Sequence, residues 1–148
     1  MSRDSDSLAA LLEKAIAIAL RAHEGQTDRS GNPYVLHPLH LMDRMDTPVE
    51  RMAAVLHDVV EDTETTISDL QAAGFPEEVT EAVRLLTHDK STLSYEQYVR
   101  RLRHNDLARK IKLADLEHNM DIRRAEQVEE DDLVRLQKYR EAWRVLTE

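Results

Sequence analysis

The sequence predicts an all-α protein, a compact bundle of about seven or eight helices, and three observations support this class. The 148 residues include only three glycines and four prolines, too few for the many tight turns of a β protein. Apolar residues recur every three or four positions along most of the chain, which is the period of a helix. Motifs that cap helices precede several of these stretches.

Eight segments carry helical spacing or a helix-start signal, with ends defined to within a few residues. In chain order they are residues 7–23, a short helix from about Pro38, 48–61, 65–73, 76–87, 95–103, 106–120 and 132–146. The apolar positions of the first segment are Leu8, Leu11, Leu12, Ala15, Ile18 and Ala19. Gly25 is a plausible stop for that helix. The polar residues 27–34, which include Gly31-Asn32-Pro33, predict the one extended connection.

Helix-start signals define the later segments. Thr47-Pro48-Val49-Glu50 is a capping box with proline at the first helical position, and Ser94 with Gln97 forms a second box. Asn105 can cap the long segment that follows it. Between these, Gly74 closes one helix and Pro76 opens the next.

Composition excludes several classes of function. There are 20 basic and 29 acidic residues, so the net charge of −9 argues against broad binding to nucleic acid or to an anionic membrane. The absence of cysteine excludes disulfides, thiolate zinc sites and cysteine nucleophiles. Neither a signal-peptide pattern nor an apolar run of about 20 residues is present. We therefore expect one cytoplasmic domain over residues 1–148.

The segment around residue 57 separates into two faces. Its apolar residues share one broad arc, and His57, Asp58, Glu61 and Asp62 share the other. One interpretation is a solvated acidic face. The other is a metal site, because crowded carboxylates repel one another unless a cation lies among them. The pair His57-Asp58 offers an imidazole and a carboxylate to one ion.

A second polar group lies on the helix after Asn105, where Lys112, Asp115 and Asn119 fill a sector between two apolar stripes. A buried Lys112–Asp115 ion pair explains this sector equally well as a metal-binding Asp115 beside a phosphate-binding Lys112. Asn119 can hydrogen-bond a ligand. We assign His118 to a different side of this helix and leave it outside the site.

Further ligands must come from other histidines, but spacing alone does not choose between His23 and His37, which flank the polar connection. At this point the sequence resembles the HD superfamily of metal-dependent phosphohydrolases. It is most similar to the hydrolase domain of the bifunctional Rel/Spo alarmone enzymes and to the stand-alone small alarmone hydrolases. The matching motifs, in order, are His23-Glu24-Gly25-Gln26, Ser30-Gly31-Asn32-Pro33-Tyr34-Val35-Leu36-His37-Pro38, His57-Asp58-Val59-Val60-Glu61-Asp62-Thr63 and Lys112-Leu113-Ala114-Asp115.

The resemblance implies an HD-domain helical bundle and a hydrolase that removes pyrophosphate from the ribose 3′ position of guanosine tetra- and pentaphosphate. It implies one divalent ion, in this family usually Mn²⁺, held by His37, His57, Asp58 and Asp115. Glu61 and Asp62 resemble the catalytic acidic pair, and His23 is expected to have a structural role. The implied substrate-binding residues are Arg29, Ser30, Lys112 and Asn119. The expected partner is a small phosphorylated nucleotide, and a homo-oligomer is left open.

The chain departs from the family pattern in its base-recognition positions. Asp28 stands where the family usually has an arginine against the guanine base, and Leu116, Asp121 and Ile122 replace two basic residues and a hydroxyl. Two alternatives therefore stay open. One is an HD hydrolase for another phosphorylated nucleotide or metabolite, such as an adenine alarmone. The other is a non-catalytic nucleotide-binding domain.

Overall fold

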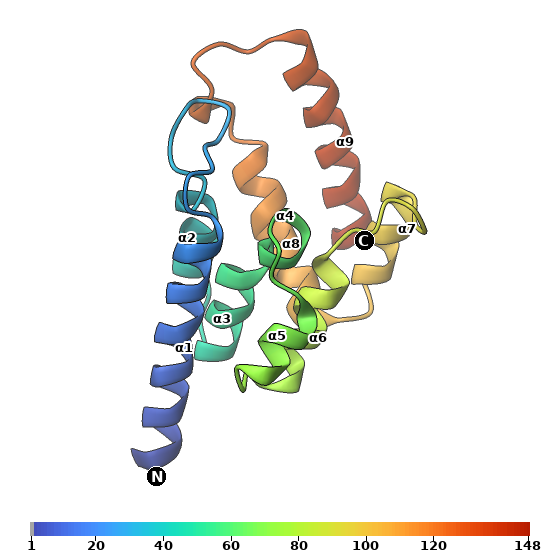
Figure 1. The fold of residues 1–148 in the computed structure, drawn as a ribbon. Helices are drawn as coiled ribbons and strands as arrows, with labels where there is room; N and C mark the ends of the chain where they lie inside the picture. Colours follow the sequence, from blue (N-terminus) through green and yellow to red (C-terminus); the bar gives the residue numbers. More distant parts are fainter. Residues whose placement is uncertain (1) are drawn as a thin grey trace.

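A computed structural model describes the backbone of residues 2–148 and the side chains of residues 7–148. In that part of the chain it contains nine α-helices, one short 3-10 helix and no β-strand, which confirms the predicted all-α class (Figure 1). The helices are α1 (Ser2–Ala22), α2 (Leu36–Asp43), α3 (Pro48–Leu56), α4 (Val59–Asp62), α5 (Ile67–Ala72), α6 (Glu77–Leu86), α7 (Tyr95–Leu102), α8 (Asp106–Asn119), η1 (Ile122–Arg124) and α9 (Glu130–Thr147).

The capping motifs define helix starts as the sequence predicts. The side-chain oxygens of Thr47 and Ser94 each accept the backbone N–H of the residue three positions later, at 3.1 Å. The side chains of those residues, Glu50 and Gln97, accept the backbone N–H of Thr47 and Ser94 in return. Asn105 accepts a backbone N–H at 2.9 Å and begins α8. The ends shift by a few residues: α1 begins before residue 7, and α9 begins two residues before 132.

The prediction of one continuous helix over residues 48–61 is wrong. The helix breaks at His57 and Asp58, and α4 is a separate single turn. His57 Nδ1 lies 2.7 Å from the carbonyl oxygen of Ala54, so the imidazole hydrogen-bonds to the backbone of the preceding helical turn. The break has a functional consequence, because it allows the side chains of both His57 and Asp58 to reach the interior rather than solvent.

The core surrounds α3, whose residues 52–56 are all buried. This helix packs against α1, α2, α6 and α8, while α8 also packs against α9. Figure 1 shows α1 and α9 on opposite sides of the molecule, with α3 and α8 between them. Large fully buried side chains include Leu41, Met52, Leu56, Leu70, Leu102, Ile111, Leu116 and Leu146. None of the described helices is both long and apolar enough to cross a lipid bilayer.

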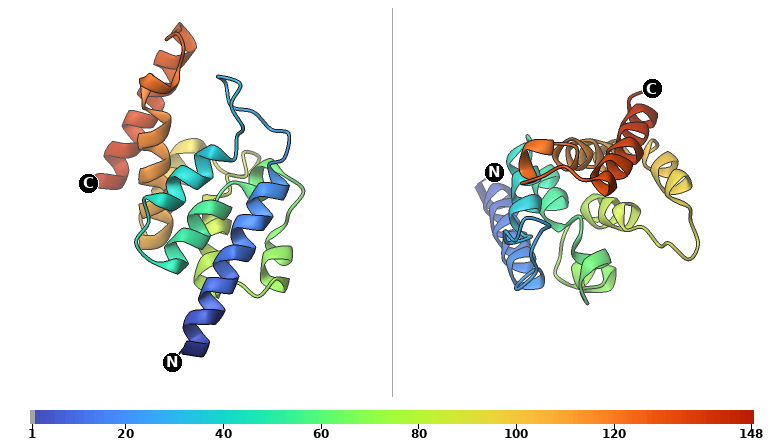
Figure 2. Two further views of the ribbon diagram at one scale, coloured as in Figure 1. Left: turned by 90° about the vertical axis from the view of Figure 1, so that its left-hand side faces the viewer. Right: turned by 90° about the horizontal axis from the view of Figure 1, so that it is seen from above.

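Two connecting segments meet at one end of the bundle. The polar connection after α1 and the segment that carries η1 both lie at this end, beside the start of α9 (Figures 1 and 2). The connection is a defined loop, since Thr27 and Pro33 form an antiparallel bridge and the backbone N–H of Asp28 donates to Asn32 at 2.8 Å. Gly31 has φ +84°, a conformation that side chains with a Cβ rarely adopt.

Candidate active site

The four predicted metal ligands, His37, His57, Asp58 and Asp115, lie together where α2, α8 and the α3–α4 break meet. His37, His57 and Asp58 each offer one donor atom within 4.8 Å of the other two. Asp115 joins them, because its Oδ1 lies 2.7 Å from His37 Nε2 and 3.6 Å from His57 Nε2. His37, His57 and Asp115 are buried polar residues in a protein whose interior is otherwise almost entirely apolar.

This donor set fits a divalent cation. The Nε2 atom of His57 is buried and, among the described residues, has no partner with hydrogen-bond geometry, although Asp58 Oδ2 lies 3.0 Å away. A buried ring nitrogen without a partner is costly unless a further group occupies that position. Imidazole and carboxylate donors together suit Mn, Fe or Zn ions.

The cluster is strongly polarised by its own charges. Burial disfavours the charged form of His57, but the carboxylates of Asp58 and Asp115 outweigh it and raise the pKa of this histidine well above its usual value. Burial likewise opposes ionisation of Asp115, yet Lys112 and the two histidines hold the pKa of that carboxyl well below its usual range. The pKa of Asp58 is also lowered, so the carboxylates of Asp58 and Asp115 are both ionised and can attract a cation.

Asp115 is fixed by Lys112 and Asn119 in addition to His37. Lys112 Nζ donates to Oδ2 at 3.0 Å, while Asn119 Nδ2 donates to Oδ1 at 3.0 Å. Lys112 is largely buried and lies over the rings of Tyr95 and Tyr98. Its ammonium group thus forms the internal ion pair, which is one of the two interpretations that the sequence left open.

His118 contacts the cluster, so the prediction that it lies outside the site is wrong. Its Nδ1 lies 2.7 Å from His37 Nδ1, and its ring stacks on that of His40 with centroids 3.9 Å apart. The spacing contained the signal, because His118 follows Asp115 by three residues and such residues are neighbours on a helix surface. His23 instead hydrogen-bonds Gln26 at 2.8 Å, which agrees with its expected structural role at the start of the loop.

Tyr34 is a site residue that the sequence analysis missed. Its hydroxyl donates to Asp58 Oδ2, and its ring packs between those of His23 and His37. Burial, together with the adjacent Asp58 carboxylate, raises the pKa of this phenol. Tyr34 therefore remains a neutral donor that orients Asp58.

Glu61 and Asp62 extend the acidic group along α4. Glu61 Oε1 accepts the backbone N–H of His88 at 2.7 Å, and the backbone N–H of Asp62 donates to the Asp58 carbonyl at 3.0 Å. Partial burial and the carboxylates of Asp58 and Glu61 raise the pKa of Asp62 to about 6. Both residues are exposed to solvent, and neither is among the described residues that line the neighbouring cavity.

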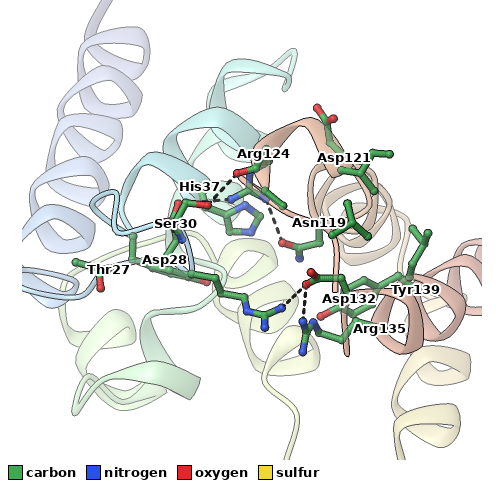
Figure 3. A pocket seen from close by; sticks show the side chains of 16 residues that line it. Thr27, Asp28, Ser30, His37, Asn119, Asp121, Arg124, Asp132, Arg135 and Tyr139 are labelled. Carbon is green, nitrogen blue, oxygen red and sulfur yellow. Dashed lines mark hydrogen bonds and ion pairs between the residues drawn. The ribbon is translucent and has the colours of Figure 1, made fainter. Parts of the chain in front are cut away.

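A cavity of about 410 Å³ opens beside the cluster of His37, His57, Asp58 and Asp115 (Figure 3). Its walls come from the loop after α1, the segment around η1 and the start of α9. The lining is charged and apolar: it combines three arginines with three aspartates and several apolar side chains, namely Arg29, Arg124, Arg135, Asp28, Asp121, Asp132, Ile122, Val128 and Leu136. Ser30 and Asn119 also line it, as the sequence predicts for substrate-binding residues, whereas Lys112 is not among the lining residues. His37 and Tyr34 belong to both the cavity and the cluster.

Comparison with known proteins identifies relatives of this chain, although no family model matches it. It is 33% identical over 126 residues to the guanosine-3′,5′-bis(diphosphate) 3′-pyrophosphohydrolase MESH1 of Danio rerio, which covers 77% of this chain and 69% of that protein. The chain belongs to this hydrolase family. It is also 36% identical over 122 residues to the bifunctional (p)ppGpp synthase/hydrolase SpoT of Escherichia coli.

The share of the relative that this chain covers differs between the matched proteins. The chain spans 17% of the length of the bifunctional Escherichia coli relative, and the match covers 74% of this chain. A solved structure described as a metazoan ortholog of SpoT that hydrolyses ppGpp matches over 93% of this chain and 85% of that chain. Its TM-score is 0.76 at 25% identity, so the helical fold of this hydrolase family extends over nearly the whole molecule.

In this member of the family, Asp28 organises the loop that forms one cavity wall. Its Oδ1 accepts the backbone N–H groups of Ser30 and Asn32, both at 2.9 Å, and its Oδ2 lies 4.0 Å from Arg124. Two backbone bonds to one short acidic side chain are typical of a tight turn. The carboxylate is therefore a structural part of the loop, rather than a free group facing a base.

Two of the cavity arginines were not predicted from the sequence. Arg124 donates to the carbonyl of His118 at 3.0 Å, and its own carbonyl accepts the hydroxyl of Ser30 at 2.9 Å. Arg135 comes from α9 and lies across the cavity from the loop (Figure 3). No local motif marks either residue, because each reaches the cavity only through the packing of α9 and η1 beside a distant loop.

Proposed function

We propose that this chain hydrolyses the 3′-pyrophosphate of guanosine tetra- and pentaphosphate. The observation that carries the proposal is the position of His37, whose Nε2 faces the cluster while the residue also lines the cavity that holds three arginines. A phosphorylated ligand in that cavity thus lies beside the imidazole and carboxylate groups of the cluster. Membership of a family of 3′-pyrophosphohydrolases supports the same reaction.

We propose that His37, His57, Asp58 and Asp115 hold one divalent cation, Mn²⁺, because the buried His57 Nε2 and the ionised carboxylates suit such an ion. A divalent cation bound there polarises a phosphoryl oxygen and lowers the pKa of bound water. Tyr34 and Asn119 orient Asp58 and Asp115 through hydrogen bonds, and ligand-orienting contacts of this kind commonly tune metal affinity.

Hydrolysis breaks the bond between the ribose 3′ oxygen and phosphorus and joins the oxygen of water to that phosphorus. One proton of the water must leave, and one proton must reach the 3′ oxygen. In our proposal Glu61 accepts the proton from water, since the backbone N–H of His88 fixes its carboxylate. Asp62 delivers a proton to the leaving oxygen. General acid–base groups of this kind contribute about 10²-fold to 10⁴-fold to rate.

Substrate binding in this proposal falls to Arg29, Ser30 and Asn119, which line the cavity, together with Arg124 and Arg135. Guanidinium groups suit phosphate because their planar donors match its oxygens. Lys112 acts differently from our expectation: it stabilises the ionised form of Asp115 from the protein side rather than contacting phosphate.

The test is a substrate panel with product identification. Purified protein with Mn²⁺ is incubated with ppGpp, pppGpp and the adenine counterpart of ppGpp, and the nucleotide and pyrophosphate products are separated. Release of GDP and pyrophosphate from ppGpp supports the proposal. Turnover of the adenine compound alone favours the alternative hydrolase, and binding of every compound without turnover favours the non-catalytic alternative. Asp58→Asn serves as the inactive control.

A further inference from the structure

We propose that Asp132 sets the affinity of the cavity for phosphate groups, by occupying two arginines that a phosphorylated ligand must bind. The inference deepens the proposed function and rests on it for the identity of the ligand. Asp132 Oδ1 accepts Arg29 Nη1 at 2.8 Å and Arg135 Nη2 at 2.6 Å. All three residues line the cavity, and Figure 3 shows Asp132 between Arg135 and the guanidinium group opposite it.

The two carboxylate oxygens of Asp132 have different hydrogen-bond partners. Oδ2 accepts the backbone N–H of Glu129 at 2.9 Å and so closes the capping box that begins α9. Oδ1 makes no contact with the backbone of this helix start and faces only the two guanidinium groups. The helix therefore needs one oxygen of the side chain, whereas the second oxygen serves the cavity.

The remaining cavity arginine is also held by the protein itself. Arg124 donates to the carbonyl of His118 at 3.0 Å, and its Nη2 lies 4.0 Å from the carboxylate of Asp28. Each guanidinium among the described lining residues thus has a carboxylate of the chain nearby. A phosphate that enters must exchange places with carboxylate oxygens, and Asp132 is the carboxylate that holds two arginines at once.

Removal of the Asp132 charge is therefore expected to strengthen ligand binding. Asp132→Asn keeps an oxygen for the Glu129 N–H and replaces the charged partner of both arginines with a neutral amide. Each ion pair is partly exposed, with 64% of the Arg29 side chain and 25% of the Asp132 side chain accessible. Such pairs are worth about 0.2–1 kcal/mol each, so release of two pairs converts to roughly a twofold to thirtyfold gain in affinity.

The experiment measures GDP binding to the Mn²⁺-loaded protein by isothermal titration calorimetry. We expect the dissociation constant of Asp132→Asn to fall about twofold to thirtyfold. Asp131→Asn is the matched control, because this exposed carboxylate lies in the same first turn of α9 and is not among the cavity-lining residues. Its binding should stay at the parent value. Asp132→Ser, which also removes the charge, serves as a second uncharged variant.

Two further results decide the inference. In a background that carries Arg29→Ala and Arg135→Ala, Asp132→Asn should give no gain, and 0.5 M salt should shrink the gain in the parent background. Equal or weaker GDP binding by both Asp132 variants, or no GDP binding by any of the proteins, overturns the proposal. If the variants bind GDP more tightly while the parent fails to cleave ppGpp, the inference stands and the proposed reaction fails.

Discussion

The Nδ1 atoms of His37 and His118 lie 2.7 Å apart, and the planes of the two rings differ by only 6°. A hydrogen bond between two such atoms requires a proton on one and a lone pair on the other. Burial, together with Arg124 and His37, lowers the pKa of His118 to about 4, so His118 is neutral and can accept. His37 is then the donor through Nδ1, and its other ring nitrogen, Nε2, faces the cluster 2.7 Å from Asp115 Oδ1.

The first prediction concerns this hydrogen bond. His118→Phe keeps a ring against His40 but removes the acceptor, so His37 loses the contact that fixes its orientation. We expect Mn²⁺ affinity to fall about tenfold or more, the usual scale for loss of a group that orients a metal ligand. Competition with a fluorescent chelator measures this affinity. His40→Phe preserves the stack without touching His37, and an equal loss there would contradict the assignment.

The second prediction concerns Asp58, which lies among the cluster donors. In the parent, Mn²⁺ at about 100 times its dissociation constant should stabilise the fold by about 2.7 kcal/mol and raise the melting temperature by about 5 °C or more. Asp58→Asn should abolish this rise, because it removes an anionic ligand without changing shape. Thermal denaturation with Mn²⁺ or with a chelator measures the difference. Asp43→Asn, an exposed carboxylate on α2, should respond as the parent does.

The third prediction separates chemistry from metal binding. Glu61→Gln retains an oxygen for the His88 N–H, and Asp62→Asn retains its backbone contact with Asp58. We expect each to lower kcat for ppGpp by about 10²-fold or more while Mn²⁺ content stays at the parent level. Initial rates and metal analysis on the same preparations test this. Parent-like turnover in both variants would show that neither residue transfers a proton.

The fourth prediction concerns Lys112, whose ammonium group neutralises the buried Asp115. Lys112→Met leaves that carboxylate without its cation, and loss of one partner of a buried pair typically costs about 3–5 kcal/mol. The free energy of unfolding in urea, with metal removed, should fall accordingly. Lys110→Met is the control, since Lys110 makes exposed pairs with Asp46 and Glu50. Equal losses in the two variants would argue against a special role for Lys112.

The fifth prediction concerns the loop built on Asp28. Asp28→Arg removes the acceptor of two backbone N–H groups, so we expect a lower melting temperature and a higher KM for ppGpp. Asp28→Asn keeps the acceptor oxygen and should stay within about twofold of the parent KM, because an asparagine forms the same turn. A lower KM in Asp28→Arg would instead show that an arginine at this position reaches the base.

Much of the helical framework follows from short-range signals in the sequence. The capping residues Thr47, Ser94 and Asn105 satisfy the first N–H groups of their helices within three or four residues, so local sequence determines where these helices begin. The break at His57 has a different origin. It depends on an imidazole that turns toward a buried cluster formed by α2 and α8. The periodicity of residues 48–61 alone does not indicate these contacts with distant helices.

The same distinction applies to the site. His57 and Asp58 are adjacent in sequence, and the resemblance to alarmone hydrolases added His37 and Asp115. The structure brings these four together, while their role as ligands remains a proposal. Arg124 and Arg135 were not predicted, because their position in the cavity depends on how η1 and α9 pack beside the loop. Lys112 was ambiguous from sequence, since a buried lysine beside an aspartate serves equally well as a partner of that aspartate or of phosphate.

The ion pair between Arg29 and Asp132 joins residues that are 103 positions apart. The histidines and carboxylates of the cluster, by contrast, are all present once Asp115 has been synthesised. During translation, therefore, a nascent chain that has emerged through α8 carries every proposed metal ligand but only one wall of the cavity. The cavity that is proposed to hold the nucleotide is therefore completed only when α9 has been synthesised.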